Sequence, residues 1–351
     1  MANYAPTSWR RLALFALLFV LLTAAGLYSV WGQFAGRELT FDTRLLQPWV
    51  LLSLLALLAV YYLSDALRLG YTLQALGHRV PLRRLLSLVF INLFFSNITP
   101  MPTGGGFAQI WYLRREGVPF GHATAATTLR TLLAVAFIFT LAPLCLLTLD
   151  VFSKGTLGKN IGWALAGFVV LYLGFFALVL FRTHWLIGLV SVLLQQLRRW
   201  HGLSDRRHRR WQFRLRREML RFARAFREYG SGNHWAVFAS ILFTALFLVS
   251  LFSFPALLLW GLGYSVNYVN VLGLLLVTTF IMYFSPTPGA SGISEGVFGH
   301  FFRSLIGGPH LLLVTLTWRA LTIYLGMAVG LVLFKRTLAK NLLRDAQRNK
   351  Q

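Results

Sequence analysis

Long apolar runs dominate the sequence and restrict it to a membrane fold. Each run has about twenty residues, which as a helix is enough to cross a hydrocarbon core of roughly 30 Å. Only 13% of the residues are charged, whereas a soluble domain carries about a quarter. A β-barrel would need short strands of alternating polarity, and the sequence has none. The sequence predicts an all-α polytopic membrane protein with six full spans, at about residues 12–31, 49–69, 123–149, 160–181, 235–262 and 310–334.

The basic residues orient these spans. Residues 182–234 contain thirteen arginines against three acidic residues, and Arg10 and Arg11 precede the first span. Because positive loops stay in the cytoplasm, we expect this loop and both termini to face the cytoplasm, in the cytoplasmic (inner) membrane. Apolar residues recur at helical spacing from Trp211 to Tyr229. This pattern favours an amphipathic helix on an anionic leaflet, although a loop that only sets the topology explains the arginines equally well.

The net charge of +24 needs an anionic partner, and anionic lipid headgroups are the partner that we expect. The basic residues lie beside apolar segments, and no nucleic-acid-binding motif accompanies them, so we expect no nucleic-acid partner. The eight histidines are scattered without the spacing of metal ligands. We therefore expect neither a metal nor a cofactor.

Two further apolar regions, at about 85–106 and 269–306, are interrupted by proline and glycine. The interruptions read "SNITPMPTGGGFAQ" (residues 96–109) and "FSPTPGASGISEG" (residues 284–296). The apolar pieces beside them have about fourteen residues, and a helix of that length reaches only about 21 Å. We therefore predict two broken or re-entrant helical hairpins. By the expected topology, the first has both ends in the cytoplasm and the second has both ends outside, so they enter from opposite faces.

The two interruptions align with each other. An arginine also follows each one within an apolar helix, Arg130 thirty residues after Pro100 and Arg319 thirty-three residues after Pro286. Chance similarity is the alternative, since membrane helices use proline and glycine freely. We predict a single transmembrane domain over residues 1–351 with an inverted repeat, the first copy at about 49–149 and the second at about 235–334. The aligned pairs are Pro100 with Pro286, Pro102 with Pro288, Gly106 with Gly292, and Gln109 with Glu295.

Broken helices at membrane depth can form a polar site. Unpaired backbone groups are tolerated there only inside protein or beside a wet cavity. Helices that restart after Gly106 and Gly292 would direct their N-termini into that cavity, where a phosphate could bind. We expect no catalytic residue and no metal ligand. The candidate lipid-binding residues are Asn97, Thr99, Pro100, Pro102, Gly104, Gly105, Gly106, Gln109, Arg130, Pro286, Pro288, Gly289, Ser291, Gly292, Glu295 and Arg319.

The charged members of this set have more than one interpretation. A planar guanidinium suits a phosphate, but Arg319 could instead form a structural ion pair with Glu295. Arg130 could extend to the cytoplasmic interface. Glu295 could pair with arginine, carry a proton or cap its own helix, and we favour pairing. Asp65, close to Arg68 in the sequence, is interpreted as charge balance at the interface.

The segments "TGGGFAQIWYLRREGVPFGHATA" and "PTPGASGISEGVF" resemble the lysylphosphatidylglycerol synthase transmembrane-region family, also called flippase-like domain proteins. The resemblance covers nearly the whole chain. Many members carry an arginine just before the aromatic residue of the first motif, where this sequence has Ile110 and Trp111. The full-length synthases add a soluble aminoacyl-transferase domain, which we do not expect in this chain. The resemblance therefore implies lipid translocation between leaflets rather than lipid synthesis.

The leading functional hypothesis is a flippase that moves an anionic lipid, of phospholipid or polyprenyl-phosphate type. The alternative is a lipid-binding membrane partner of an enzyme of lipid or envelope biosynthesis, without transport of its own. An enzyme acting on a lipid-linked substrate is disfavoured, because the sequence has no cluster of side chains suited to acid–base or nucleophilic catalysis. We therefore expect a protein that is not an enzyme.

Overall fold

The computed structural model describes residues 42–99, 103–148, 226–303 and 305–348, together with six isolated positions. Within these ranges every regular element is helical and no strand occurs. Some predicted features lie outside the described residues: Pro100 and Pro102, the spans at 12–31 and 160–181, and most of the amphipathic helix.

Long apolar helices confirm the all-α membrane fold. Four helical stretches among the described residues are long and apolar enough to span a membrane. They are α2 (Pro48–Ala75), α5 (Phe120–Thr148), α10 (His234–Gly261) and a continuous stretch made of α13 (Gly308–Arg319), a π-helical turn (Ala320–Tyr324) and α14 (Leu325–Arg348). These bounds differ by a few residues from the predicted spans, apart from α14, which runs further toward the C-terminus.

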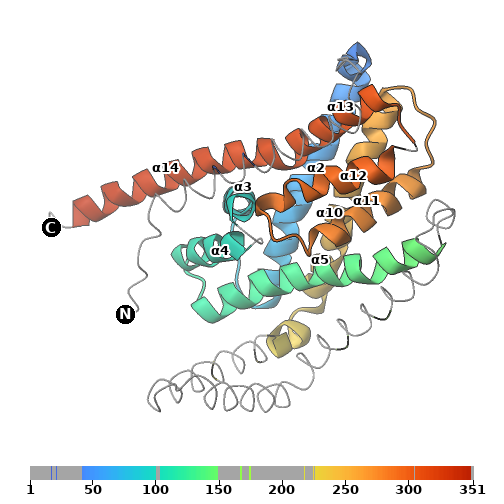
Figure 1. Ribbon diagram of the computed structural model, residues 1–351. Helices are drawn as coiled ribbons and strands as arrows, with labels where there is room; N and C mark the ends of the chain where they lie inside the picture. Colours follow the sequence, from blue (N-terminus) through green and yellow to red (C-terminus); the bar gives the residue numbers. More distant parts are fainter. Residues whose placement is uncertain are drawn as a thin grey trace, which may run out of the picture.

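The two interrupted regions form helical hairpins. The first consists of α3 (Leu82–Ile98) and α4 (Thr103–Arg115), and the second of α11 (Tyr268–Met282) and α12 (Ile293–Phe302). Between α11 and α12 lies a short 3₁₀ turn, η2 (Pro288–Ala290), which packs against α3 of the first hairpin. Both hairpins lie between α5 and the continuous α13–α14 stretch, the first beside α14 and the second beside α13 (Figure 1). The interruption of one hairpin thus contacts the other hairpin.

Glycines set the distance between α3 and its neighbours. A Cβ at Gly105 would lie 1.8 Å from Ser96 Oγ, and one at Gly330 of α14 would lie 2.0 Å from the carbonyl oxygen of Phe90. Only glycine allows such close contact. Gly106 has open space around its Cβ position, and α4 already begins at Thr103. The expectation that this helix restarts after Gly106 was therefore wrong.

The elements of the two predicted repeats match at a nearly constant spacing. α2 and α10 both have 28 residues, begin 186 residues apart (234 − 48) and end 186 apart (261 − 75). α3 and α11 also begin 186 apart (268 − 82). The two long helices pack against each other and run in opposite directions (Figure 1). The inverted repeat stays a prediction, which these correspondences support.

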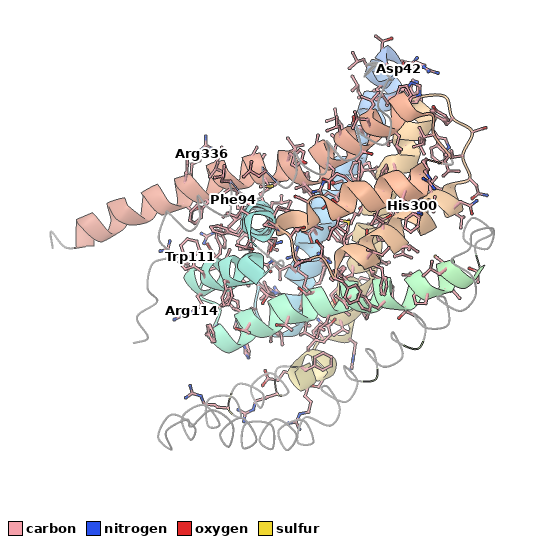
Figure 2. The ribbon with its side chains drawn as sticks, in the orientation of Figure 1. Asp42, Phe94, Trp111, Arg114, His300 and Arg336 are labelled. Atoms are coloured by element: carbon pink, nitrogen blue, oxygen red, sulfur yellow. The ribbon has the colours of Figure 1, made fainter. Side chains whose placement is uncertain are left out.

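The labelled basic, acidic and histidine side chains mark the two ends of the bundle. Arg114 and Arg336 lie at one end, and Asp42 and His300 lie at the other (Figure 2). The first of these ends is the one that the arginine distribution predicts to be cytoplasmic. Which membrane face it occupies stays a prediction.

Candidate functional site

The second hairpin holds a buried ion pair at its interruption. Glu295 of α12 and Arg319 at the end of α13 both have 0% exposure, and Arg319 Nε lies 3.0 Å from Glu295 Oε1. The Nε–H bond of Arg319 does not point toward Glu295 Oε1, so the contact is an ion pair without a hydrogen bond. Glu295 Oε2 also accepts hydrogen bonds from Gly292 N at 2.8 Å and Ser294 Oγ at 2.7 Å. The carboxylate therefore both pairs with arginine and caps its own helix, two of the three roles open to it.

The same arginine holds the backbone turn that precedes α12. Arg319 Nη2 donates to the carbonyl oxygen of Gly289 at 3.1 Å. The turn is tightly bent, with φ of 58° at Gly289, 53° at Ala290 and 84° at Gly292. A positive φ is unfavourable for alanine, so surrounding contacts must hold this turn in place. Pro288 is buried in it. Arg319 thus fixes the non-helical segment against α13.

The remaining candidates of the second hairpin lie on either side of this turn. Pro286 is exposed, whereas Ser291 is buried, and its carbonyl oxygen accepts a hydrogen bond from Thr287 Oγ1 at 2.9 Å. Gly292 is the residue from which α12 starts, as expected. The N-terminal backbone amide of Gly292 is already bonded to Glu295. A phosphate at this helix end would have to replace part of that contact.

Neutral polar groups organise the interruption of the first hairpin. Asn97 Nδ2 donates to Leu93 O at 2.7 Å, and Thr99 Oγ1 donates to Phe95 O at 2.8 Å and accepts from Gly104 N at 3.1 Å. The bond between Gly104 and Thr99 links the end of α3 to the start of α4. Gln109 is buried, and its Oε1 has no hydrogen-bond partner among the described residues. No carboxylate occupies the position that corresponds to Glu295.

Arg130 has its partner on another helix. Its Nη2 lies 2.5 Å from both carboxylate oxygens of Asp65, and Arg68 Nε donates to Asp65 Oδ1 at 2.6 Å. All three side chains are buried, with exposures of 3 to 6%. The guanidinium of Arg68 lies 3.8 Å from the ring centre of Phe247. The interpretation of Asp65 as interfacial charge balance was therefore wrong, and Arg130 does not extend to the interface, because a buried carboxylate holds it.

This buried cluster carries excess positive charge. Asp65 balances only one of its two arginines, Arg68 and Arg130, so one positive charge is in excess there, whereas Glu295 balances Arg319. Arg68 Nη1, Arg130 Nε and Arg319 Nη1 are buried without a hydrogen-bond partner in the described part of the chain. Unpaired buried donors are unfavourable unless a ligand or water satisfies them. The free donors of Arg68 and Arg130 are therefore the groups that an anion would contact.

The Asp65 cluster was missed because its carboxylate and Arg130 lie 65 residues apart on different helices. A signal for it existed in the sequence. An acidic residue within an apolar span is costly and is usually paired with a positive charge. Applying that rule to Asp65 would have predicted a partner on a neighbouring helix.

The helical fold and the buried ion pairs within apolar helices define an integral, multi-pass membrane protein. The sequence model of the family described as "Lysylphosphatidylglycerol synthase TM region" matches residues 8–330. The chain belongs to this family, as its motifs indicated. It is also similar to a "UPF0104 membrane protein" from Archaeoglobus fulgidus, at 23% identity over 325 residues, which cover 92% of this chain and 97% of that protein.

Proposed function

We propose that this protein moves an anionic lipid between the leaflets of the membrane. The observation that carries the proposal is the excess of buried arginine beside two hairpins that contact each other. A phosphate headgroup that crosses the hydrocarbon core needs positive partners at depth, because burying it alone would be very costly. The unsatisfied donors of Arg68 and Arg130 offer such partners, while the acyl or prenyl chains of the lipid stay in the bilayer.

The arrangement of the helices supports movement of this kind. Predicted inverted repeats with interrupted helices are typical of transporters that alternate between two accessible faces. The turn at Pro288–Ala290 packs against α3, so a shift of one hairpin changes the contacts of the other. The family's lipid-linked name agrees with a lipid substrate.

Lipid exchange in liposomes tests the proposal. Purified protein is reconstituted with fluorescent phosphatidylglycerol, phosphatidylcholine or a polyprenyl phosphate, and exchange is followed by quenching of the outer-leaflet fluorophore. We expect faster exchange of the anionic lipids than in protein-free liposomes. Arg68→Met should slow it at least tenfold, because it removes the excess charge and leaves the Arg130–Asp65 pair intact. Arg83→Met, at an exposed arginine of α3, is the matched control and should leave exchange unchanged.

One result would refute translocation. If wild-type liposomes exchange no lipid faster than empty ones, even with an imposed proton or sodium gradient, the protein does not move these lipids. The lipid-binding partner function then replaces it. Mass spectrometry of copurifying lipids would test that function, and loss of anionic lipid in Arg68→Met would support it.

A further inference from the structure

A chain of three side chains links helices at the basic end of the bundle. His78 Nε2 lies 2.6 Å from His122 Nδ1, and His122 Nε2 lies 3.1 Å from Glu228 Oε2. His78 follows α2, His122 lies in the first turn of α5, and Glu228 lies in the helical residues 226–231 just before α10. We call these three residues the histidine latch.

A second chain of the same kind lies at the opposite end. Tyr264 OH lies 2.7 Å from His310 Nδ1, and His310 Nε2 lies 3.3 Å from Asp42 Oδ2. Tyr264 follows α10, His310 lies in the first turn of α13, and Asp42 precedes the short 3₁₀ helix (Thr43–Leu46) that leads into α2. We call these three residues the tyrosine latch.

The two latches occupy corresponding places in the two predicted repeats. The acids are 186 residues apart (228 − 42), the residues after the first helix are 186 apart (264 − 78), and the central histidines are 188 apart (310 − 122). α2 and α10 are related by the same spacing. In each latch two residues belong to one predicted repeat, and the acid lies just before the other repeat, at Asp42 before the first and at Glu228 before the second. Each latch therefore connects the two repeats at one end of the bundle.

A shared backbone turn positions the first residue of each latch. Gly77 and Gly263 end α2 and α10 with φ of 80° and 84°, values that glycine adopts without strain. The next residue donates its backbone N–H back to the helix, His78 to Leu73 O at 2.9 Å and Tyr264 to a carbonyl of α10 at 3.0 Å. This is the hydrogen-bond pattern of a Schellman helix end. The same local fold thus places a histidine in one latch and a tyrosine in the other.

We propose that the two latches are the gates of the protein, each closing one face of the bundle by joining the repeats there. This proposal rests on the proposed lipid translocation. Alternating access requires the repeats to separate at one face while they stay together at the other. Both latches are closed in this structure, so it represents a state that is occluded at both ends. Opening one latch should tighten the other.

The latches differ at two positions, where His78 corresponds to Tyr264 and Glu228 to Asp42. The first difference should make the histidine latch sensitive to acid. The charged and titratable groups that face His78 are His122 and, beyond it, Glu228. Burial and the neighbouring His122 ring lower the pKa of His78 below its ordinary 6.5. His78 binds a proton more readily when it has left the latch. The closed histidine latch therefore loses stability as the pH falls through about 6.5 and below.

The tyrosine latch lacks this sensitivity to mild acid. The hydrogen bond from the Arg44 side chain is the main reason that the pKa of Asp42 falls to about 2. Asp42 therefore stays ionised in mild acid, so its contact with His310 Nε2 keeps its negative charge. Tyr264 adds no positive charge. Mild acid should open the histidine latch alone.

Hydrogen–deuterium exchange of the protein in lipid nanodiscs tests the gates directly. We expect His122→Ala to raise exchange severalfold in residues 76–81 and 226–233 and to lower it in residues 262–267. We expect His310→Ala to produce the reverse pattern. His234→Ala and His300→Ala remove an exposed histidine outside the latches and should change neither end. Exchange that stays constant or rises at the opposite end would overturn alternating gates.

A conservative variant tests the acid response and guards against misfolding. His78→Tyr converts the histidine latch into a tyrosine latch, so the increase in exchange at residues 76–81 between pH 7.5 and pH 5.5 should disappear. An unchanged increase would overturn the role of His78. These measurements do not require transport. If hydrogen exchange changes in opposite directions at the two ends but no lipid moves, the proposed function alone is refuted. If lipid moves but hydrogen exchange does not change in this way, the gates alone are refuted.

Discussion

Replacing Glu295 by glutamine measures how much one buried negative charge contributes to the free energy of unfolding. Glu295→Gln keeps the shape of the side chain and an oxygen that can accept from Gly292 and Ser294. The amide, however, no longer compensates Arg319, whose side chain has 0% exposure. Removing one partner of a buried ion pair costs about 3–5 kcal/mol, because the other charge stays buried. We expect a loss of that size in the free energy of unfolding.

A double-mutant cycle measures this coupling. Arg319→Leu should also destabilise the protein, but Glu295→Gln with Arg319→Leu should cost about 1–3 kcal/mol less than the sum of the single losses. The assay is reversible unfolding in mixed detergent micelles, followed by circular dichroism. Glu116→Gln is the matched control: its ion pair with Arg84 lies at the surface, where pairs contribute at most about 1 kcal/mol. Additive losses, within about 0.5 kcal/mol, would refute the pair.

Three further predictions follow from packing, charge and topology. Asp65→Asn should cost more unfolding free energy than Glu295→Gln, because it leaves two buried arginines without a carboxylate; an equal or smaller loss would contradict this. Gly105→Ala should destabilise the protein by about 1–3 kcal/mol through overpacking. Gly106→Ala adds its methyl group to free space and should be nearly neutral in the same assay. A cysteine at Ser204, in a chain whose single native cysteine is replaced by serine, should react with a membrane-impermeant maleimide from the cytoplasmic side; labelling only from outside would refute the orientation.

The sequence predicted the helices well because their determinants are local. Apolar length defines a span, and local residues such as Asn233, whose side chain accepts from two backbone amides of α10, mark where helices begin. The interruption at Gly292 was placed correctly for the same reason. The start of α4 was placed too late, because Thr99 and the close approach to α3 allow glycines inside a helix. Propensity alone does not contain that tertiary contact.

Of the two buried groups of charged residues, the sequence predicted only one. The pair of Glu295 and Arg319 was anticipated because an acidic residue and an arginine stood out within the second predicted repeat. The contact of Arg130 with Asp65 was not, because it depends on how α5 packs against α2. The latches were also missed. The histidines looked scattered, and their common spacing becomes visible only when the acidic residues before α2 and α10 are aligned with them.

The two hairpins are held by different forces, and this difference suggests which one moves more easily. Arg319 ties the turn before α12 to α13 by an ion pair and a backbone hydrogen bond. In the first hairpin the corresponding arginine, Arg130, is bound to Asp65 of α2 instead, and Gln109 takes the place of the glutamate. At its interruption that hairpin depends on close glycine packing and neutral hydrogen bonds, and its ion pair between Arg84 and Glu116 lies at the surface. These contacts are individually weaker than a buried charge pair. The α3–α4 hairpin should therefore shift at lower cost than the α11–α12 hairpin, so a rearrangement would begin at the end of the bundle where the histidine latch lies.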